Sequence, residues 1–514
     1  MPAGLTRPTT PPSAGTESSW KHEVLRTLAA AWLLTVGAQR ATAQGCPIAF
    51  GPRQAITSGA GSYCVAAGDI NADGRLDLVT ANSSANSLAY WLGQPAGGFS
   101  ARTLVNSVTG ASCVAIANVT GGPSPDLIAT NFTSSTLTLW TDALVGGGGA
   151  ALPTPTVLQA GPSPFWVVAA DLNNDGRNDL AVANFGASTV SLLIAKPDGS
   201  FEPRRTVGIG SGSLALVAAD FNGDGRVDLA AGNFANFTIS VLLNTGNANF
   251  APRVDYACGG TPRGLTAADV NGDSRPDLLC ANNDDGSIAV LLCNADGTFA
   301  PAETFDVGVS PQSIGAGDLN NDGWTDLVVA NFQSGSLSVL PGLGNGRFRA
   351  PLSVNVGNQP ACVVLADLSR DGLLDVACAG FQSEMSLLTN QTEVLRFTLQ
   401  PEPASGAPGS VVRLTAAATS SGTSPLSYRW FRGDTPVSDG FGVSGSATNQ
   451  LSLGPALAGQ SGVYRLRVSN GCGAVFSNWT YAHVPACLAD LNASGLVDVT
   501  DLYMYLDAWF AGCP

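Results

Sequence analysis

Histidine and glutamate are scarce in this sequence. The 514 residues include 2 histidines and seven glutamates, and charged residues of all kinds make up 12%. Histidine is the usual general acid or base near neutral pH and a common metal ligand. His22 and His483 leave little material for either kind of chemistry. We therefore expect a protein that is not an enzyme.

Basic residues and long apolar runs are also few. The 24 lysines and arginines are outnumbered by 39 acidic residues, the net charge is −15, and no basic stripe suited to nucleic acid is present. No segment approaches the roughly eighteen apolar residues of a membrane span. Long amphipathic stretches are almost absent, whereas 61 glycines and 31 prolines divide the chain into short runs. We expect an all-β chain with several domains.

The N-terminus has the pattern of an export signal. Lys21 and Arg26 precede an apolar run over residues 28–36, and Ala41 and Ala43 form a small-x-small cleavage site. The pattern predicts a signal peptide with an N-terminal extension over residues 1–43, cleaved after Ala43. The mature protein would then be secreted or held at the cell surface. An uncleaved anchor is the alternative.

The cysteines fit an exported chain. Eleven are present, so disulfides are permitted and at least one thiol stays unpaired within the chain. Cys46, close to the cleavage site, raises the alternative of a lipoprotein, although the usual Leu ahead of it is missing. Five others recur at two positions of a repeat and are predicted to be core residues first and disulfide partners second: Cys64, Cys113, Cys362, Cys280 and Cys378.

An acidic segment recurs at a nearly constant interval. The segment that begins at Asp69 returns at Asp171, Asp220, Asp269, Asp318 and Asp367, with a weakened copy at Asn118, and the intervals are 49, 53, 49, 49, 49 and 49 residues. The four extra residues fall in a glycine-rich stretch at 146–150. Such a period is the mark of a repeat architecture.

Each repeat contains four strand-like runs. One apolar run precedes the acidic segment, a second follows it, and an alternating run leads to a fourth opened by a phenylalanine such as Phe201. Four strands in about fifty residues match one blade of a β-propeller, so residues 44–396 are predicted to form a seven-bladed β-propeller of four-stranded blades. Phe50 lies 49 residues before Phe99, and the last repeat lacks a fourth strand. Residues 48–58 are therefore predicted to complete the seventh blade.

The acidic segments have the chemistry of calcium loops. In the pattern Asp-x-Asn-x-Asp-Gly-x-x-Asp, side chains at positions 1, 3, 5 and 9 and the carbonyl at position 7 can surround a hard cation, and Gly at position 6 permits the bend. An acidic Asx-turn loop without an ion is the alternative. The predicted ligands are Asp69, Asn71, Asp73 and Asp77; Asp171, Asn173, Asp175 and Asp179; Asp220, Asn222, Asp224 and Asp228; Asp269, Asn271, Asp273 and Asp277; Asp318, Asn320, Asp322 and Asp326; and Asp367, Ser369, Asp371 and Asp375.

Two loops depart from the pattern. The fifth has Ser274 at position 6, which carries a modest backbone penalty. The second, with Asn118, Thr120, Gly122 and Asp126 at the ligand positions, keeps one carboxylate and is predicted to bind no ion. Six repeats also place an asparagine thirteen residues after the loop begins, and these are predicted to cap hairpins: Asn82, Asn131, Asn184, Asn233, Asn282 and Asn331.

The repeats over residues 48–390 resemble the FG-GAP/VCBS family, whose integrin-type propellers carry the same loop between the first two strands of a blade. The resemblance implies blades stiffened by Ca²⁺ in extracellular, often adhesive or carbohydrate-associated proteins. It does not identify a ligand.

Two further pieces are expected after the repeats. Residues 397–485 contain alternating strands with Trp430 and Tyr464, which resembles an immunoglobulin-like β-sandwich. Residues 486–514 resemble one half of a dockerin module, a calcium loop followed by a helix, flanked by Cys487 and Cys513. This cassette implies a cell-surface attachment partner, or docking onto its own neighbour. Its predicted calcium ligands are Asp490, Asn492, Ser494, Asp498 and Asp501.

Together these patterns predict a secreted or cell-surface, calcium-binding propeller scaffold for adhesion or for binding an extracellular protein or carbohydrate. Six ions in the propeller and one in the cassette would offset most of the charge of −15. A propeller lectin is the alternative, because Tyr63, Phe165 and Trp166 enter the inner strands and could stack on sugars or simply pack. A polysaccharide-acting enzyme is the less favoured third hypothesis.

Overall fold

The computed structural model describes residues 47–144, 152–357, 359–406, 410–422, 424–440, 442–454, 460–470 and 474–483. The predicted signal peptide and the predicted C-terminal cassette, with its five candidate ligands, lie outside these residues. The regular structure in the described part is β-strand, as expected for an all-β chain. No helix there is long and apolar enough to cross a membrane.

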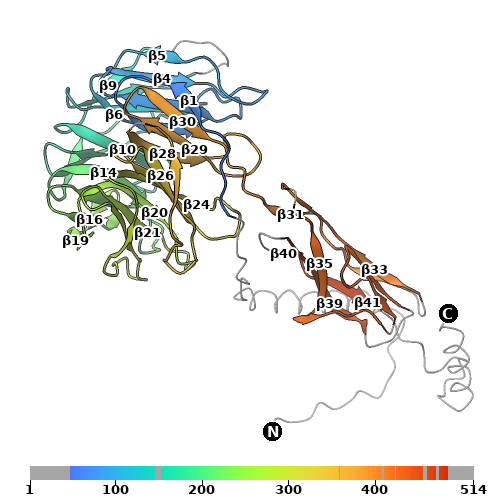
Figure 1. The fold of residues 1–514 in the computed structure, drawn as a ribbon. Coiled ribbons are helices and arrows are strands. Elements are labelled where there is room, and N and C mark those ends of the chain that lie inside the picture. The colour runs from blue at the N-terminus through green and yellow to red at the C-terminus, as the bar shows by residue number, and fades with distance from the viewer. Residues whose placement is uncertain are drawn as a thin grey trace, which may run out of the picture. The chain divides into compact units, whose positions relative to one another are not determined.

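The described residues between 47 and 390 form repeated four-stranded antiparallel sheets, as in a β-propeller (Figure 1). The first three sheets consist of β2 (Ser62–Gly68), β3 (Asp77–Asn82), β4 (Ser87–Trp91) and β5 (Thr103–Val105); β6 (Ala111–Ala117), β7 (Asp126–Asn131), β8 (Thr136–Trp140) and β9 (Thr156–Gln159); and β10 (Pro164–Ala170), β11 (Asp179–Asn184), β12 (Thr189–Leu193) and β13 (Arg205–Gly208).

The next three sheets consist of β14 (Ser213–Ala219), β15 (Asp228–Asn233), β16 (Thr238–Leu242) and β19 (Val254–Ala257); β20 (Pro262–Ala268), β21 (Asp277–Asn282), β22 (Ser287–Leu291) and β23 (Glu303–Asp306); and β24 (Pro311–Gly317), β25 (Asp326–Asn331), β26 (Ser336–Leu340) and β27 (Leu352–Asn355). A small hairpin of β17 (Asn244–Gly246) and β18 (Asn249–Phe250) extends the fourth repeat.

The remaining sheet joins the two ends of the repeat region. It contains β28 (Pro360–Ala366), β29 (Asp375–Gly380) and β30 (Glu384–Leu388), and its fourth strand is β1 (Gln54–Thr57) from the start of the chain. β1 pairs antiparallel with β30, from Gln54 opposite Leu387 to Thr57 opposite Glu384. The innermost strands contact one another in the cycle β2, β6, β10, β14, β20, β24, β28 and back to β2. The prediction that residues 48–58 complete the last sheet is confirmed.

The burial of each sheet explains its sequence. The second strands are buried along almost their whole length, as in β11, because other sheets pack on both of their faces. Outer strands such as β13 are mostly exposed or half-buried. The prediction that a phenylalanine opens the outer strand is wrong. Phe201 instead forms an isolated bridge with Ala195, and β13 begins at Arg205, because the phenylalanine closes the turn ahead of the strand.

The repeated asparagines cap the hairpins between second and third strands, as predicted. Asn233 is fully buried, and its Nδ2 donates to Thr238 Oγ1 at 3.1 Å and to Ser240 Oγ at 2.8 Å. Asn331 makes the corresponding bonds with two serines of its own hairpin. The amide thus links the buried hydroxyl groups of the hairpin, which cannot obtain hydrogen bonds from water.

The cysteines of the described residues are free and buried, so the prediction that they are core residues first is confirmed. Cys64 and Cys113 lie on neighbouring innermost strands with their sulfurs 3.7 Å apart. The hydrogen bond with Cys113, together with burial, raises the pKa of Cys64 well above its ordinary value. Such a thiol stays protonated and unreactive at neutral pH.

The described residues between 395 and 483 form further sheets around a separate core. One sheet contains β32 (Ala404–Ser405), β41 (Thr480–His483), β39 (Gly462–Ser469), β35 (Ser427–Arg432) and β36 (Thr435–Pro436), and β40 (Ala474–Phe476) also pairs with β39. A second sheet contains β33 (Val412–Thr415), β38 (Gln450–Leu453) and β37 (Val443–Ser444). β31 (Leu395–Leu399) pairs with β34 (Ala417–Ser420).

Trp430 and Tyr464 occupy the centre of this second core. Both are buried: Trp430 Nε1 donates to the carbonyl of Thr448 at 2.9 Å, and the Tyr464 hydroxyl donates to the carbonyl of Gln460 at 2.6 Å. A buried tryptophan and a tyrosine bonded to backbone a few residues upstream are hallmarks of the immunoglobulin sandwich.

Candidate metal centres

Each acidic loop connects the first and second strands of its sheet. In the third repeat, β10 ends at Ala170, which pairs with Asp179 at the start of β11, and the loop occupies the residues between them. The same register recurs in the other repeats, so all the loops lie at the end of the ring where the innermost strands finish. The fold therefore places the predicted ligands at equivalent points of successive sheets.

The side chains at positions 1, 3 and 5 turn inward onto the backbone of their own loop. In the first loop, Asp69 accepts hydrogen bonds from the N–H groups of Asp73 at 3.0 Å and Gly74 at 2.6 Å. Asn71 Oδ1 accepts from the N–H of Asp73, and Asp73 Oδ1 accepts from that of Arg75. The five other loops predicted to bind calcium repeat most of these bonds. Oxygen atoms from alternate residues are thereby gathered inside one tight turn.

The bend at position 6 requires the left-handed region of backbone conformation. Gly74 has a φ of 79°, and the equivalent Ser274 is held at 67°. A residue with a Cβ pays about 1 kcal/mol or more in this region, so the penalty predicted for Ser274 is present in the structure.

The aspartate at position 9 has a structural role that the sequence pattern did not reveal. Asp77 is fully buried, and its two oxygens accept from the N–H of Ile70 at 2.9 Å and the N–H of Gly93 at 2.7 Å. It therefore ties the loop to the end of the third strand. Asp126 makes the equivalent bonds in the second repeat, which explains why that loop keeps this one carboxylate. A carboxylate can accept about four bonds, so capacity for an ion remains.

The second loop holds its shape through an amide. Asn118 Oδ1 accepts from the N–H of Gly121 at 2.7 Å, and Asn118 Nδ2 donates to the carbonyl of Gly122 at 2.6 Å. This loop closes with an uncharged side chain where the others use carboxylates. The prediction that it binds no ion stays a prediction.

Burial controls the ionisation of the position 9 carboxyls. It raises the pKa of Asp77, Asp179, Asp228 and Asp277 to about 6, and that of Asp326 to about 7, against the partial offset of their backbone hydrogen bonds. The neighbouring acidic side chains at positions 1 and 5 add a smaller effect in the same direction. Without a cation, these loops disfavour the charged form of their own aspartates.

The raised values predict how stability depends on pH when calcium is removed. The pKa of each of these aspartates is higher in the folded chain than in the unfolded chain, so the folded state binds more protons between pH 4 and pH 7. The chelated protein should therefore melt at a higher temperature at pH 5 than at pH 7.5, as thermal unfolding in both buffers would show. With calcium bound, protons compete with the ion, so the loaded protein should melt at a higher temperature at pH 7.5 than at pH 5. Equal pH profiles with and without chelator would contradict this expectation.

Four loops carry an arginine at position 7 that sequence reasoning passed over. Arg75, Arg177, Arg226 and Arg275 each form an ion pair with the aspartate at position 5 of the same loop. Three of them also donate from Nε to the carbonyl that follows the third strand of their sheet. Three carboxylates and one guanidinium leave such a loop with a charge of −2, which one divalent cation would balance. The signal available in the sequence was an arginine repeatedly following the glycine or serine of position 6.

The donor set fits calcium in kind. Three carboxylates, an amide or hydroxyl oxygen and a backbone carbonyl are hard oxygen ligands, and the loops contain neither histidine nor cysteine. In the described residues, no three acidic, histidine or cysteine side chains converge as they would around a bound metal. The arginine holds the position 5 carboxylate, and backbone N–H groups hold position 9. Ion binding would therefore require the position 5 carboxylate to turn from its arginine.

Comparison with known proteins points to a repeat family. A family model described as FG-GAP-like repeat matches residues 171–231, 220–280, 269–329 and 318–378, and each match begins at position 1 of an acidic loop. No curated protein matches the chain.

Solved structures resemble the fold only loosely. The BBS1N structure in complex with ARL6DN has 11% sequence identity and a TM-score of 0.49, and the alignment covers 68% of this chain and 98% of that one. An Agrocybe aegerita lectin structure that addresses recognition of terminal N-acetylglucosamine has 18% identity and a TM-score of 0.42, with 63% and 86% covered. A Lactobacillus plantarum protein has 16% identity and a TM-score of 0.44, with 59% and 86% covered. Likeness at this level carries no functional argument.

The family match and the sheet topology agree on the same residues. The matched region spans 171–378, where every acidic loop separates the first two strands of a four-stranded sheet. These residues of the chain therefore match FG-GAP-like repeats and form the repeated four-stranded sheets of a β-propeller.

Proposed function

We propose that this chain is a secreted or cell-surface scaffold whose seven-bladed propeller, residues 44–396, is stabilised by about six calcium ions. The observation that carries the proposal is the recurrence of one donor set, at one register position, in six of the sheets. A single acidic loop could be an Asx turn, but three carboxylates in each of six tight loops leave an excess of negative charge, even in the four loops where an arginine pairs with position 5. The ion supplies charge neutralisation and crosslinks its loop.

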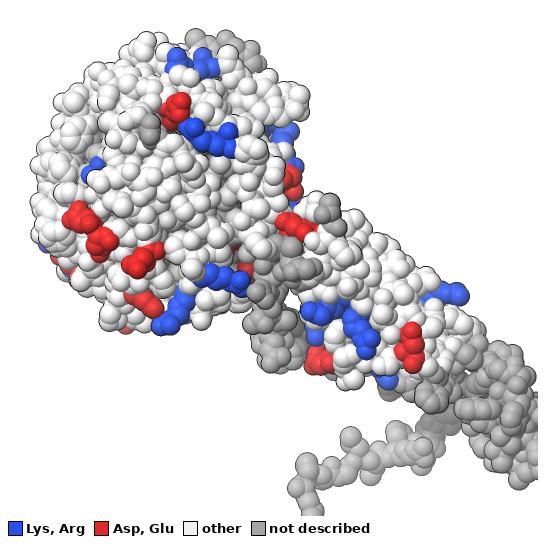
Figure 2. Space-filling view, in the orientation of Figure 1, with Lys and Arg blue, Asp and Glu red and all other residues white. Residues whose placement is uncertain are grey.

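In this proposal the remaining parts have supporting roles. Residues 397–485 form an immunoglobulin-like spacer, which the positions of Trp430 and Tyr464 support. Residues 486–514 form the calcium-binding attachment cassette, and residues 1–43 direct export. The partner is an extracellular protein or carbohydrate and not nucleic acid. On the face drawn in Figure 2, acidic and basic side chains are scattered over a mostly uncharged surface, without the basic stripe that phosphate backbones require.

Counting bound calcium tests the proposal. The full chain, dialysed against calcium and analysed by native mass spectrometry, should hold about six or seven ions, one for each complete loop. Asp224→Asn should remove one ion, because it takes a carboxylate from position 5 of the fourth loop. Asp198→Asn is the matched control, since Asp198 is an exposed turn residue bonded to Ser200 and should leave the count unchanged. Fewer than about three ions would overturn the proposal.

Carbohydrate binding is a second candidate, because aromatic side chains line a central cavity. Tyr63, Phe165 and Trp166 border it, and the rings of Tyr63 and Phe165 pack edge to face with centroids 5.5 Å apart. A flat aromatic face can stack on a sugar ring. A glycan array probed with the calcium-loaded protein would separate this candidate from a scaffold that binds only protein.

A further inference from the structure

Every sheet of the ring has a β-bulge near the start of its innermost strand. In β20, for example, the register with β21 shifts between Pro262 and Gly264, so Arg263 is the extra residue. The same shift occurs at the equivalent place in the other innermost strands. A bulge re-aims a side chain out of the regular alternation, and bulges are frequent beside binding sites.

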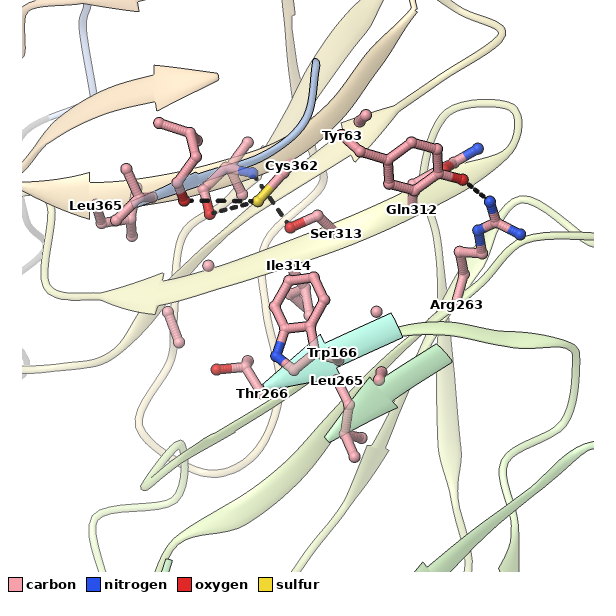
Figure 3. A pocket seen from close by; sticks show the side chains of 18 of the residues that line it. Tyr63, Trp166, Arg263, Leu265, Thr266, Gln312, Ser313, Ile314, Cys362 and Leu365 are labelled. Carbon is pink, nitrogen blue, oxygen red and sulfur yellow. Dashed lines mark hydrogen bonds between the residues drawn. The ribbon is translucent and has the colours of Figure 1, made fainter. Parts of the chain in front are cut away.

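The bulged residues border a cavity of about 290 Å³ lined by the innermost strands (Figure 3). Five of the seven sheets contribute one such residue each to the lining: Tyr63, Phe165, Arg263, Gln312 and Ala361. The chemistry differs from sheet to sheet although the position is the same. This volume lies just below the roughly 300–1,000 Å³ that is usual for ligand pockets, which suits a ligand with a single ring.

Arg263 is a cation without an acidic partner. It takes part in none of the ion pairs of the described residues. Its Nη2 donates to the hydroxyl of Tyr63, and its Cζ lies 5.6 Å from the ring centroid of Tyr63 and 6.0 Å from that of Phe234. Its Nε is buried without a hydrogen-bond partner. A half-buried guanidinium that lines the cavity without a carboxylate to balance it leaves charge for an anion.

Gln312 supplies the complementary acceptor. Its Oε1 is buried and has no hydrogen-bond partner in the described structure. Figure 3 shows Gln312 on the same side of the cavity as the Tyr63–Arg263 pair, with the indole of Trp166 pointing into the space nearby. A buried unpaired acceptor is costly, and a small rotation of this side chain, which lines the cavity, would let the oxygen accept from a ligand's hydroxyl.

We propose that this cavity binds a small ring-shaped carboxylate that also carries a hydroxyl group. Arg263 would hold the carboxylate, Gln312 would accept from the hydroxyl, and the Tyr63 and Trp166 rings would cover the flat body of the ligand. One guanidinium matches one carboxylate, whereas a phosphate generally requires several cationic or backbone donors. The ring itself can come from a sugar acid or from an aromatic hydroxy acid.

This site is independent of the calcium proposal. The bulges lie where the innermost strands begin, and the acidic loops lie where the same strands end. Failure of calcium binding would therefore leave this inference standing, and the reverse also holds.

Calorimetric titration of the full chain tests the proposal with D-glucuronate and 4-hydroxybenzoate as the two probes. At least one should bind saturably, and its neutral counterpart, D-glucose or 4-hydroxybenzamide, should bind at least about tenfold more weakly because it cannot pair with the guanidinium. Which probe binds identifies the ring. Arg263→Met should weaken binding by at least about tenfold. Arg253→Met is the matched control, because Arg253 lies just before the outer strand β19, is not among the residues that line the cavity, and pairs with Asp255.

Folding of the variants is followed by thermal melting. Arg263→Met should keep or raise the melting temperature, because it removes a half-buried cation that lacks an acidic partner. Gln312→Met should also weaken binding of the carboxylate probe, and this loss would not depend on charge. The proposal is overturned if neither carboxylate binds, if the neutral counterparts bind equally well, or if both variants bind as the wild type does.

Discussion

Removal of calcium from the full chain is expected to lower its melting temperature by at least about 15 °C. An ion present at a hundred times its dissociation constant contributes about 2.7 kcal/mol, so six sites would contribute on the order of 15 kcal/mol. The loops also lose their charge balance, because each complete loop keeps three carboxylates. Differential scanning calorimetry in calcium and in chelator measures the change.

Restoring magnesium instead of calcium is the control for this experiment. Magnesium demands a smaller, more regular shell and sheds water reluctantly, so it should recover little of the lost stability. A chelated protein that melts within about 3 °C of the loaded one would mean that the loops hold their shape through their own hydrogen bonds and that calcium is not structural.

Loss of β1 is expected to have an effect of similar size. Deletion of residues 47–57 would remove the outer strand of the last sheet, the bridge between Phe50 and Asn390, and the ion pair between Arg53 and Glu384 at 2.7 Å. It would also expose the edge of β30 to pairing with other chains. We expect a fall in melting temperature on the order of 10 °C together with concentration-dependent aggregation, measured by calorimetry and light scattering.

A crosslinked variant tests the same junction without a deletion. Thr57 lies directly opposite Glu384, so Thr57→Cys with Glu384→Cys should form a disulfide across the closing strands. The loop that it closes is very long, and a stabilisation of about 2–4 kcal/mol is expected. The gain should disappear in reductant, while the wild type treated in the same way should change little. An oxidised variant no more stable than its reduced form would contradict the role of this junction.

Periodicity made most of the fold predictable. The 49-residue interval located the loops, the four runs of each repeat and even the strand that returns from residues 54–57. It worked because sheets that pack against equivalent neighbours need equivalent buried strands and equivalent turns. The misplaced phenylalanine had a local cause: Phe201 bridges across a turn, and an aromatic residue in a turn is hard to distinguish from one that opens a strand.

The candidate sites were predictable only where the repeats agree. Calcium ligands recur, so six copies supported one another. The aspartate at position 9 was predicted as a ligand, but its hydrogen bonds to backbone N–H groups were not. One of these bonds comes from a residue after the third strand, which lies outside the nine-residue loop pattern. Arg263 and Gln312 share a register position and no chemistry, so a search for what repeats passed over them. In a repeat ring, specificity resides in the side chains that differ.

The pairing of β1 with β30 also sets an order for folding. β1 is the first strand of the repeat region to be synthesised, yet its partner lies roughly 330 residues later in the chain. Contacts between such distant residues form slowly, because the intervening chain must first be brought together. The sheet that contains both ends is therefore the last to be completed. Until then β30 presents an open edge, so the nascent ring is most vulnerable to aggregation just before its final strand is paired.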